Sequence, residues 1–261
     1  MRLFWSDGGP MHHNFGDQLS PIIVNRVFGV PTVHSGLDSC DMLALGSILE
    51  DAEEHVSTTA PYIWGSGFIE DGGPWQGNQI HPRAVRGNLT RPRLAHLTRR
   101  TLALGDPGLL TPHAFPEYQG LPKRFPISLV PHFIDIEHPR IIDLRKNESL
   151  HMINVLDPVE EVIRQICQSR LIISSSLHGL IVADAFRIPN YRMRMVDNRW
   201  GGDYKFEDYC SAFGQSTAVT SPEDVVHNPD RYTSAWEPRT RLTDLQEGLL
   251  RAFPSTHRLP I

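Results

Sequence analysis

Short apolar runs alternate with helix-like patterns along the chain, and several of these runs end in a glycine turn. Apolar residues spaced three and four apart from Leu19 to Phe28 predict an amphipathic helix, and Gly29 is a typical helix stop. Strands that alternate with helices favour an α/β fold. In the first part of the chain, the runs interpreted as strands are residues 2–5, 42–48, 62–64, 84–85 and 102–104.

The pattern restarts after a stretch rich in proline and glycine at residues 112–126. Beyond it, Asp157 followed by Pro158 and two glutamates predicts a helix start, with Asp157 as the N-cap. We therefore expect two Rossmann-like domains that face a cleft, residues 1–120 and residues 121–261, the second with a C-terminal tail. The other elements predicted in this part are strands at 127–130, 151–155 and 170–174 and helices at 178–186 and 242–252.

Composition narrows the class of protein. The 261 residues are 40% hydrophobic with a formal net charge of −5, which excludes general disorder. No apolar run approaches the roughly 18 residues of a membrane span, and the N-terminus lacks a signal-peptide pattern. Three widely spaced cysteines do not make a disulfide framework, and the pI near 6.2 argues against a general nucleic-acid binder. We expect a soluble cytoplasmic protein.

Lysine is rare in this chain. Only three of the 25 basic residues are lysines, at positions 123, 146 and 205. Genomic base composition explains most of this bias, and arginine also suits bidentate binding of carboxylate and phosphate. Each of the few lysines is therefore a candidate for a specific functional role.

The segment Ser174 to Gly179 lies between a predicted strand and a predicted helix. Ligands of open α/β sheets bind beyond the carboxyl ends of the strands, where a helix N-terminus attracts an anion. The hydroxyls of Ser175 and Ser176 could donate to phosphate oxygens, and His178 could bind an anion or move a proton. Gly179 allows close approach by a ligand or another backbone. The serines could equally serve only as helix caps, with His178 a core residue.

Several motifs in order resemble the polysaccharide pyruvyl transferase family, most closely its exopolysaccharide branch of succinoglycan ketal formers. The resemblance covers residues 14 to about 209, and seven ordered matches are far more specific than any one of them. The matching motifs are Asn14 to Leu19, Trp64 to Gly67, Arg83 to Gly87, Leu104 to Leu110, Val130 to His132, Ser175 to Asn190 and Gly201 to Phe206.

The resemblance implies transfer of pyruvate from phosphoenolpyruvate onto two hydroxyls of one sugar, which makes a cyclic ketal and releases phosphate. It also implies a two-domain arrangement similar to glycosyltransferase B, with the donor in the cleft and with no metal or cofactor. This chemistry needs an acid near the methylene carbon, a base for the hydroxyls and groups that stabilise the leaving phosphate.

Three residues of the motifs carry the expected donor site. The family's histidine corresponds to His178, and whether it acts as general acid or only as a phosphate ligand stays open. The family's first-domain arginine corresponds to Arg86, which we expect to face the cleft and bind the donor's carboxylate or phosphate; the alternative is a surface ion pair. Lys205 could clamp the same anion, with Ser175, Ser176 and Gly179 beside it.

The first domain is expected to hold the acceptor. Asp17 is a candidate base, although it could simply cap the helix, and Asn14 and Gly16 form the turn before it. His132 follows a predicted strand and is expected to line the cleft, and with Asn14 and Gly16 it is a candidate for binding the acceptor. We interpret Asp106 as a turn residue and the pair at 12–13 as solvated histidines rather than metal ligands.

Two other functions fit the same pattern. A nucleotide-sugar glycosyltransferase would also place a diphosphate at a helix N-terminus, and a non-catalytic domain could bind a phosphorylated sugar. The expected partners are phosphoenolpyruvate and a sugar of a polysaccharide or lipid-linked oligosaccharide, and no nucleic acid. A lipid-linked acceptor would leave room for peripheral association with the inner face of the membrane. The acceptor sugar, the ketal positions and the oligomeric state are not readable from these residues.

Overall fold

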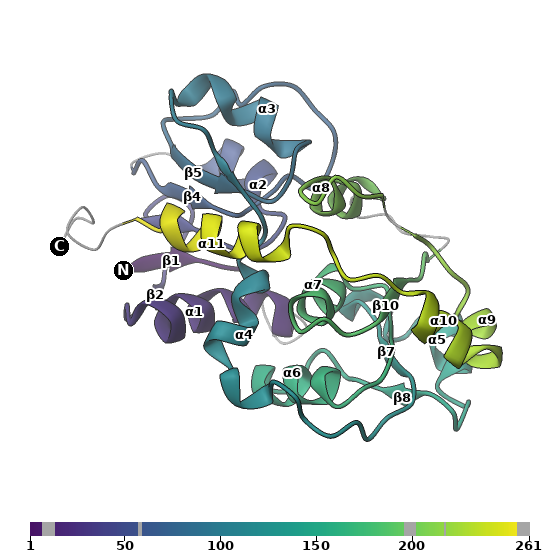
Figure 1. The fold of residues 1–261 in the computed structure, drawn as a ribbon. Coiled ribbons are helices and arrows are strands. Elements are labelled where there is room, and N and C mark those ends of the chain that lie inside the picture. The colour runs from purple at the N-terminus through teal and green to yellow at the C-terminus, as the bar shows by residue number, and fades with distance from the viewer. Residues whose placement is uncertain (7–13, 57–58, 196–201, 217, 255–261) are drawn as a thin grey trace.

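Parallel strands form two sheets in the computed structural model, which describes residues 1–6, 14–56, 59–195, 202–216 and 218–254 (Figure 1). The first sheet has the strand order β2-β1-β3-β4-β5-β6, and the second has the order β10-β9-β7-β8. The strands are β1 Arg2–Phe4, β2 Val33–His34, β3 Met42–Leu43, β4 Tyr62–Trp64, β5 His81–Val85, β6 Ala103–Leu104, β7 Ser128–Val130, β8 His151–Met152, β9 Ile172–Ser174 and β10 Asn190–Arg192.

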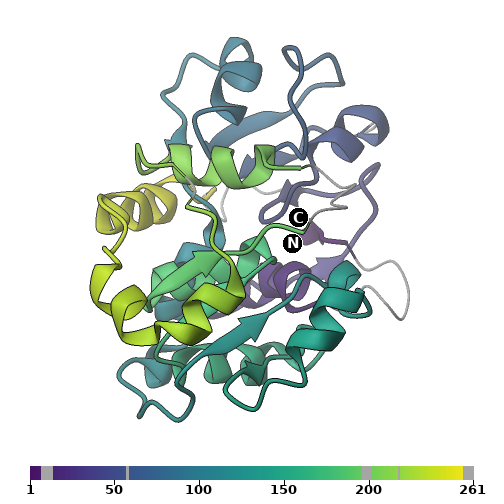
Figure 2. The same ribbon diagram turned by 90° about the vertical axis from the view of Figure 1, so that its right-hand side faces the viewer.

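Helices connect the strands, as the alternating pattern predicts. Figure 2 shows the first sheet mostly above the second, with helices around both. The helices are α1 Phe15–Phe28, α2 Leu49–His55, α3 Thr90–Leu94, α4 Thr111–Ala114, α5 Pro139–Leu144, α6 Val159–Cys167, α7 Leu177–Ala185, α8 Tyr204–Ser211, α9 Pro222–His227, α10 Pro229–Ala235 and α11 Leu242–Ala252.

The α/β class and the parallel sheets are confirmed, and some predicted boundaries need correction. The strand predicted at 151–155 extends only over His151–Met152. The run at 42–48 is a strand only at Met42–Leu43, because the chain turns at Gly46, where φ is +109°. Helix α6 has Pro158 rather than Asp157 as its N-cap. The carboxylate of Asp157 instead accepts a hydrogen bond from Nδ2 of Asn154 at 2.8 Å, which takes it away from the helix.

Helix α1 has both of its ends defined by local chemistry. Oδ1 of the N-cap Asn14 accepts a hydrogen bond from the backbone N–H of Gly16 at 2.9 Å. At the other end Gly29 adopts a φ of +66° and its N–H closes the helix on the carbonyl of Asn25. Glycine tolerates this left-handed conformation at little cost, so the predicted stop at Gly29 is confirmed.

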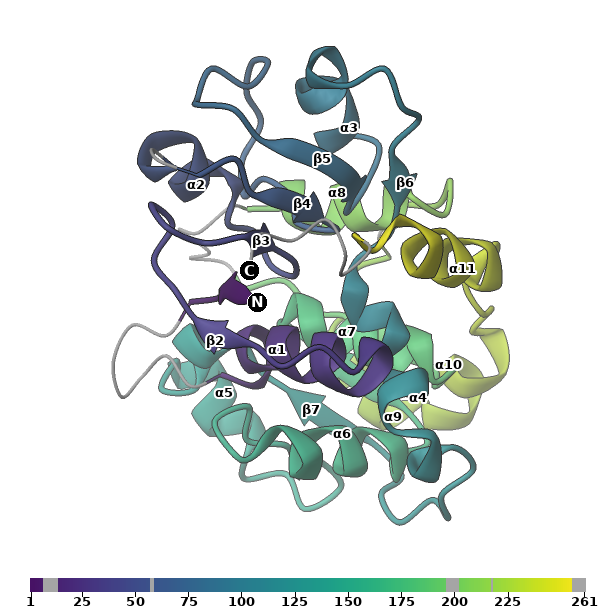
Figure 3. The same cartoon turned by 90° about the vertical axis from the view of Figure 1, so that its left-hand side faces the viewer.

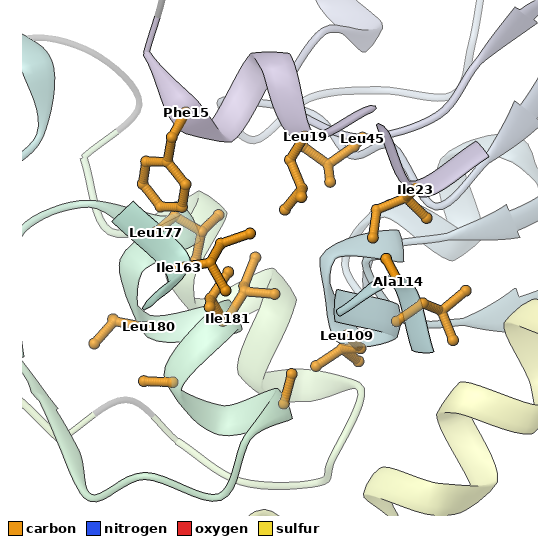
Figure 4. Packing of buried hydrophobic residues seen from close by; sticks show 14 of the residues in the cluster. Phe15, Leu19, Ile23, Leu45, Leu109, Ala114, Ile163, Leu177, Leu180 and Ile181 are labelled. Carbon is orange, nitrogen blue, oxygen red and sulfur yellow. The ribbon is translucent and has the colours of Figure 1, made fainter. Parts of the chain in front are cut away.

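The largest core lies between the two sheets. Figure 4 shows side chains of α1 opposite those of α7, with the short turn at Pro107–Leu110 and α4 closing one side. The backbone N–H of Phe15 also donates to the carbonyl of Val155 at 2.8 Å, which joins α1 to the second half. The labelled residues of this core are Phe15, Leu19, Ile23, Leu45, Leu109, Ala114, Ile163, Leu177, Leu180 and Ile181.

Two late helices return to the first sheet. Figure 3 shows α11 beside β6 and α8 behind β4 and β5. The indole Nε1 of Trp64 in β4 donates to the carbonyl of Leu249 in α11 at 2.9 Å. A division after residue 120 stays a prediction, and these contacts mean that residues 121–261 supply part of the first sheet's cover. In the described part of the chain, no helix is both long enough and apolar enough to cross a membrane.

Candidate functional site

A cavity of about 520 Å³ collects side chains from both halves of the chain. It lies where the carboxyl ends of β1, β3 and β7 meet the N-termini of α1, α2 and α7, as expected for an α/β ligand site. Its lining residues are Phe4, Ser6, Asn14, Asp17, Ser47, Ile48, Glu50, Asp51, Ile69, His132, Phe133, Ile134, Ser176, Leu177, His178 and Lys205.

His178 stands in the first turn of α7 and is partly buried. Its Nε2 atom is enclosed by protein, and no residue in the described part of the chain forms a hydrogen bond with it. Burial and the nearby cations of Lys205 and Arg86 lower the pKa of His178 to about 3, so the ring is neutral at pH 7. An unpartnered ring nitrogen in this cationic setting is ready to meet an anionic ligand.

Lys205 begins α8 and brings a cation to the cavity. Only 6% of the residue is exposed, and its Nζ lies 5.6 Å from the centroid of the Phe206 ring. No described residue accepts a hydrogen bond from this Nζ. Burial, followed by the neighbouring Arg86, lowers the pKa of Lys205 to about 8. The ammonium therefore remains mostly protonated at pH 7 and has free donors for an anion.

Asp17 is the acid group of the cavity. Its Oδ2 accepts a hydrogen bond from Nδ2 of Asn14, and Asn14 is also the cap of α1. Burial raises the pKa of Asp17 to about 7, although Asn14 and Lys205 oppose this shift. A carboxyl group that titrates near neutral pH suits proton transfer. Asn14 fixes Asp17 in place, and the cap of α1 is Asn14 rather than Asp17.

His132 faces the same cavity from the loop after β7. Its Nδ1 accepts a hydrogen bond from the N–H of Ile134 at 3.4 Å. Its backbone N–H donates to Oγ of Ser175 at 2.9 Å, and that hydroxyl donates to Oδ2 of Asp135 at 2.6 Å. Burial, and then Lys205 and His178, lower the pKa of His132 to about 3. Ser175 thus supports the loop and does not line the cavity.

Ser176 is both helix cap and cavity wall. Its Oγ accepts a hydrogen bond from the N–H of Gly179 at 3.4 Å, so the capping interpretation of this serine is confirmed. Gly179 itself is enclosed, because a Cβ atom there would lie 2.5 Å from Oγ of Ser174 and 2.9 Å from Cγ1 of Val130. The atoms that lie close to Gly179 belong to side chains, rather than to the backbone or the ligand expected there.

Arg86 does not line the cavity. The residue is fully buried, and its Nε donates to Oδ2 of Asp208 at 2.9 Å. Its other nitrogens donate to Oγ of Ser47 and to the carbonyl of Phe68. The guanidinium of Arg86 was expected to face the cleft, but it is buried beside the cavity. Its partner carboxylate comes from α8, so the pair is not a surface ion pair either.

The structure thus brings six expected residues to one cavity and leaves four behind it. Gly16 and Gly179 contribute through close packing, and Ser175 and Arg86 contribute through hydrogen bonds behind the cavity wall. The interpretation of Asp106 as a turn residue is confirmed, because its Oδ1 accepts a hydrogen bond from the N–H of Gly108 at 2.8 Å. The histidine pair at 12–13 lies outside the described residues. Those at the cavity are Asn14, Asp17, His132, Ser176, His178 and Lys205.

Sequence patterns missed several residues of the cavity. Ser47 and Phe133 follow strands and Glu50 lies in the first turn of α2, and only the glycine turn at Gly46 marks where the chain leaves β3. Among the described residues, no group of three or more histidine, cysteine, aspartate or glutamate side chains could hold a metal ion.

Comparison with known proteins decides the family. Residues 62–194, about half of the chain, match the model of the polysaccharide pyruvyl transferase family. The chain belongs to this family. Its matched region includes Arg86 and the segment from Ser174 to Gly179, and it contains strands β4, β5 and β6 of the first sheet and all four strands of the second.

Individual relatives agree with this membership. The succinoglycan biosynthesis protein ExoV of Rhizobium meliloti is 33% identical over 188 residues, which are 68% of this chain and 55% of ExoV. An uncharacterized protein of Acanthamoeba polyphaga mimivirus is 28% identical over 118 residues, which are 44% of this chain and 41% of that protein. The chain thus spans about half the length of these relatives.

One solved structure is similar in outline. It is a crystal structure of an uncharacterized protein from Klebsiella pneumoniae, 12% identical, with a TM-score of 0.47. The similarity covers 84% of this chain and 92% of that chain.

Proposed function

We propose that this protein transfers pyruvate from phosphoenolpyruvate onto two hydroxyls of one sugar of a polysaccharide or its precursor, forming a cyclic ketal and releasing phosphate. The observation that carries the proposal is the grouping of Lys205, His178 and Asp17 in one cavity at the N-terminus of α7. Family membership and the similarity to a succinoglycan biosynthesis protein support a pyruvyl transferase role.

The donor is an anion with two charged groups. We place its phosphate at the ammonium of Lys205 and the first turn of α7, where helix N–H groups and the hydroxyl of Ser176 face the cavity. Their lowered pKa values leave His178 and His132 neutral at pH 7, and a bound phosphate would favour their protonated forms. Binding of the donor would therefore charge the group that must deliver a proton.

The reaction needs protons to move in balance. A proton from His178 adds to the methylene carbon, and the first sugar hydroxyl attacks the adjacent carbon while its proton passes to Asp17. Asp17 passes this proton to the phosphate as the C–O bond to phosphate breaks. The second hydroxyl then attacks the same carbon to close the ketal, and its proton returns to His178. The two hydroxyl protons equal the one gained by the methylene and the one carried by phosphate, so the site regains its starting state.

The arrangement of the two sheets suits a donor and an acceptor held from opposite sides. We propose a glycosyltransferase-B-like arrangement in which α7 and His132 present the donor and α1 and α2 present the acceptor. The apolar side chains of Phe4 and Phe133 at the cavity wall could pack against a sugar ring. A cytoplasmic location, and contact with the membrane's inner face for a lipid-linked acceptor, stay predictions.

Ligand stabilisation tests the donor first. Phosphoenolpyruvate should raise the melting temperature and bind by titration calorimetry, whereas a panel of nucleotide-sugars should not, because only a ligand of the folded state stabilises it. Incubation with phosphoenolpyruvate and candidate oligosaccharides should then release phosphate and increase the sugar's mass by pyruvate less one water. Selective stabilisation by a nucleotide-sugar would overturn the proposal in favour of glycosyl transfer, and binding without turnover on any acceptor would favour a binding domain.

A further inference from the structure

Helix α8 is fastened to the end of β5 by one carboxylate. Oδ1 of Asp208 accepts hydrogen bonds from the backbone N–H groups of Leu89 and Thr90 at 3.0 and 2.9 Å. Its Oδ2 accepts from Nε of Arg86 at 2.9 Å and from the hydroxyl of Thr90 at 2.7 Å. Arg86 and Asp208 are both 0% exposed. The carboxylate is therefore fully engaged within the protein.

A second set of contacts joins the same surfaces. The N–H of Asn88 donates to Oγ of Ser211 at 2.7 Å, and its Nδ2 donates to the carbonyl of Ser211 at 2.6 Å. Gly87 lies so close to α8 that a Cβ atom would come within 1.7 Å of the carbonyl oxygen of Asp208. The chain after β5 and the helix α8 thus form one tightly packed unit, which we call the α8 lock: Arg86 to Thr90 against Asp208 and Ser211.

The lock holds Lys205, for which the described residues provide nearby carboxylates, Asp135 and Asp17, but no hydrogen-bond acceptor. Lys205 precedes Asp208 by three residues, so the two side chains lie on one face of α8. No hydrogen bond to a described residue fixes the Lys205 ammonium, and Arg86 repels it. One helical turn beyond Lys205, on the same side of α8, the hydroxyl of Tyr209 donates to Oδ2 of Asp184 in α7 at 2.9 Å. The placement of Lys205 in the cavity follows from where α8 is docked.

We propose that Arg86 and Asp208 are positioning residues for Lys205, so that Arg86 acts on the donor's anionic group through α8 and not by contact with it. This inference rests on the proposed function. Stability alone is a weak reason for such a pair, because buried ion pairs seldom stabilise a fold more than apolar side chains of similar volume. Because this pair joins the two halves of the chain beside the cavity, the placement of α8 is a better-supported role for it than stability.

The two tasks for Arg86 predict opposite results for Asp208→Asn. The asparagine keeps an oxygen for the N–H groups of Leu89 and Thr90 but loses the charge that holds the guanidinium. Positioning through α8 predicts that the dissociation constant for phosphoenolpyruvate rises at least about tenfold. Direct contact predicts an unchanged or lower constant, because the released guanidinium would be freer to bind the donor. An unchanged or lower constant overturns the proposal.

Lysine side-chain resonances give a readout that does not depend on the donor. Protein labelled with ¹³C at lysine Cε has three signals, and Lys205→Arg assigns one of them. Ser211→Ala removes one contact of the lock without changing any charge. It is milder than Asp208→Asn and therefore tests the proposal even if Asp208→Asn does not fold. We expect Ser211→Ala to shift or broaden the Lys205 signal and to leave the Lys123 signal in place. An unmoved Lys205 signal overturns the proposal.

A matched control comes from an exposed pair. Lys146 and Asp143 lie 3.1 Å apart with side chains 73% and 80% exposed, so Asp143→Asn should move only the Lys146 signal. Failure of the proposed function has a different signature. In that case phosphoenolpyruvate shifts none of the three signals in the unaltered protein, while Ser211→Ala still shows whether the lock places Lys205.

Discussion

The imidazole of His178 lies directly against the backbone of Gly16. A Cβ atom at Gly16 would come within 2.3 Å of Nδ1 and 2.7 Å of Cγ of the ring. Gly16 sits in the first turn of α1 and His178 in the first turn of α7, so this contact joins the two helices that carry Asp17 and the donor site. A glycine is needed here for space and not for an unusual backbone angle.

Gly16→Ala should therefore displace His178. The added methyl group cannot fit unless the ring or α1 moves, and a misplacement of about 1 Å in an active site can reduce turnover about 10²-fold. We expect transfer to fall by about that factor. Gly29→Ala is the matched control, because Gly29 has no atom within 4 Å of a Cβ but has a φ of +66°. That variant should lose about 1 kcal/mol of stability and keep its turnover. Full activity in Gly16→Ala would show that the contact does not set the position of His178.

Replacement of His178 tests its role in proton transfer. We expect His178→Gln to fold normally and to lower kcat at least about hundredfold, as for the loss of a general acid. The amide can still donate a hydrogen bond to phosphate but cannot deliver a proton at pH 7. A raised KM with kcat preserved would instead assign His178 to phosphate binding alone. Steady-state kinetics with saturating acceptor separates the two outcomes.

The affinity for phosphoenolpyruvate should depend on pH through Lys205. Burial lowers the pKa of Lys205 to about 8, so its ammonium is lost as the pH rises through that value. Binding should weaken by up to about tenfold per pH unit above pH 8, since the donor needs the cation. Calorimetry between pH 6.5 and 9.5 measures this slope. Lys205→Arg should remove it, because a guanidinium stays protonated over the whole range.

Ionisation of Asp17 contributes in the same direction and needs its own control. Burial raises the pKa of Asp17 to about 7, so this group becomes an anion near the donor as the pH rises through 7. Asp17→Asn should reduce the slope between pH 6.5 and 7.5, where the protonation of His178 that accompanies donor binding also contributes, and should leave the loss above pH 8. A profile that persists unchanged in Lys205→Arg would mean that another group governs donor affinity.

Much of the fold follows from apolar runs alone. Buried parallel strands read as short continuous hydrophobic stretches, which is why the positions of β4, β7 and β9 could be predicted. Helix α11 is amphipathic with clear periodicity, and its predicted bounds of Leu242–Ala252 are those of the structure. Short helices such as α3 and α8 were missed, since five to eight residues carry little periodic signal.

The candidate site was predicted only in part, because some of its residues depend on partners that are far away along the chain. His178, Ser176 and Asp17 stand at helix starts, which sequence signals mark directly. Arg86 is different, because the carboxylate that engages it belongs to Asp208, 122 residues later. No local pattern reveals such a partner. The sequence also contained no signal for the segments that carry Ser47 and Phe133. The order of strands in a sheet decides which strand ends meet at one cavity, and local patterns do not reveal that order.

The packing of α11 against the first sheet predicts that buried residues of this helix contribute to the free energy of unfolding. Leu249 is fully buried, its Cδ1 lies 3.1 Å from the Cβ position of Gly105, and its carbonyl accepts the indole N–H of Trp64. Leu249→Ala should lose about 2–5 kcal/mol of unfolding free energy, because it removes buried methyl groups and leaves a cavity. Urea denaturation measures the loss.

A surface truncation provides the comparison for that value. Val33 is 59% exposed, so Val33→Ala should change the unfolding free energy by no more than about 0.5 kcal/mol. Phosphoenolpyruvate affinity should remain unchanged in Leu249→Ala at temperatures where the protein is folded, because Leu249 does not line the cavity. A loss as small as that of Val33→Ala would mean that α11 contributes little to the first sheet. Its docking would then be a weak contact between the end of the chain and a sheet that is stable without it.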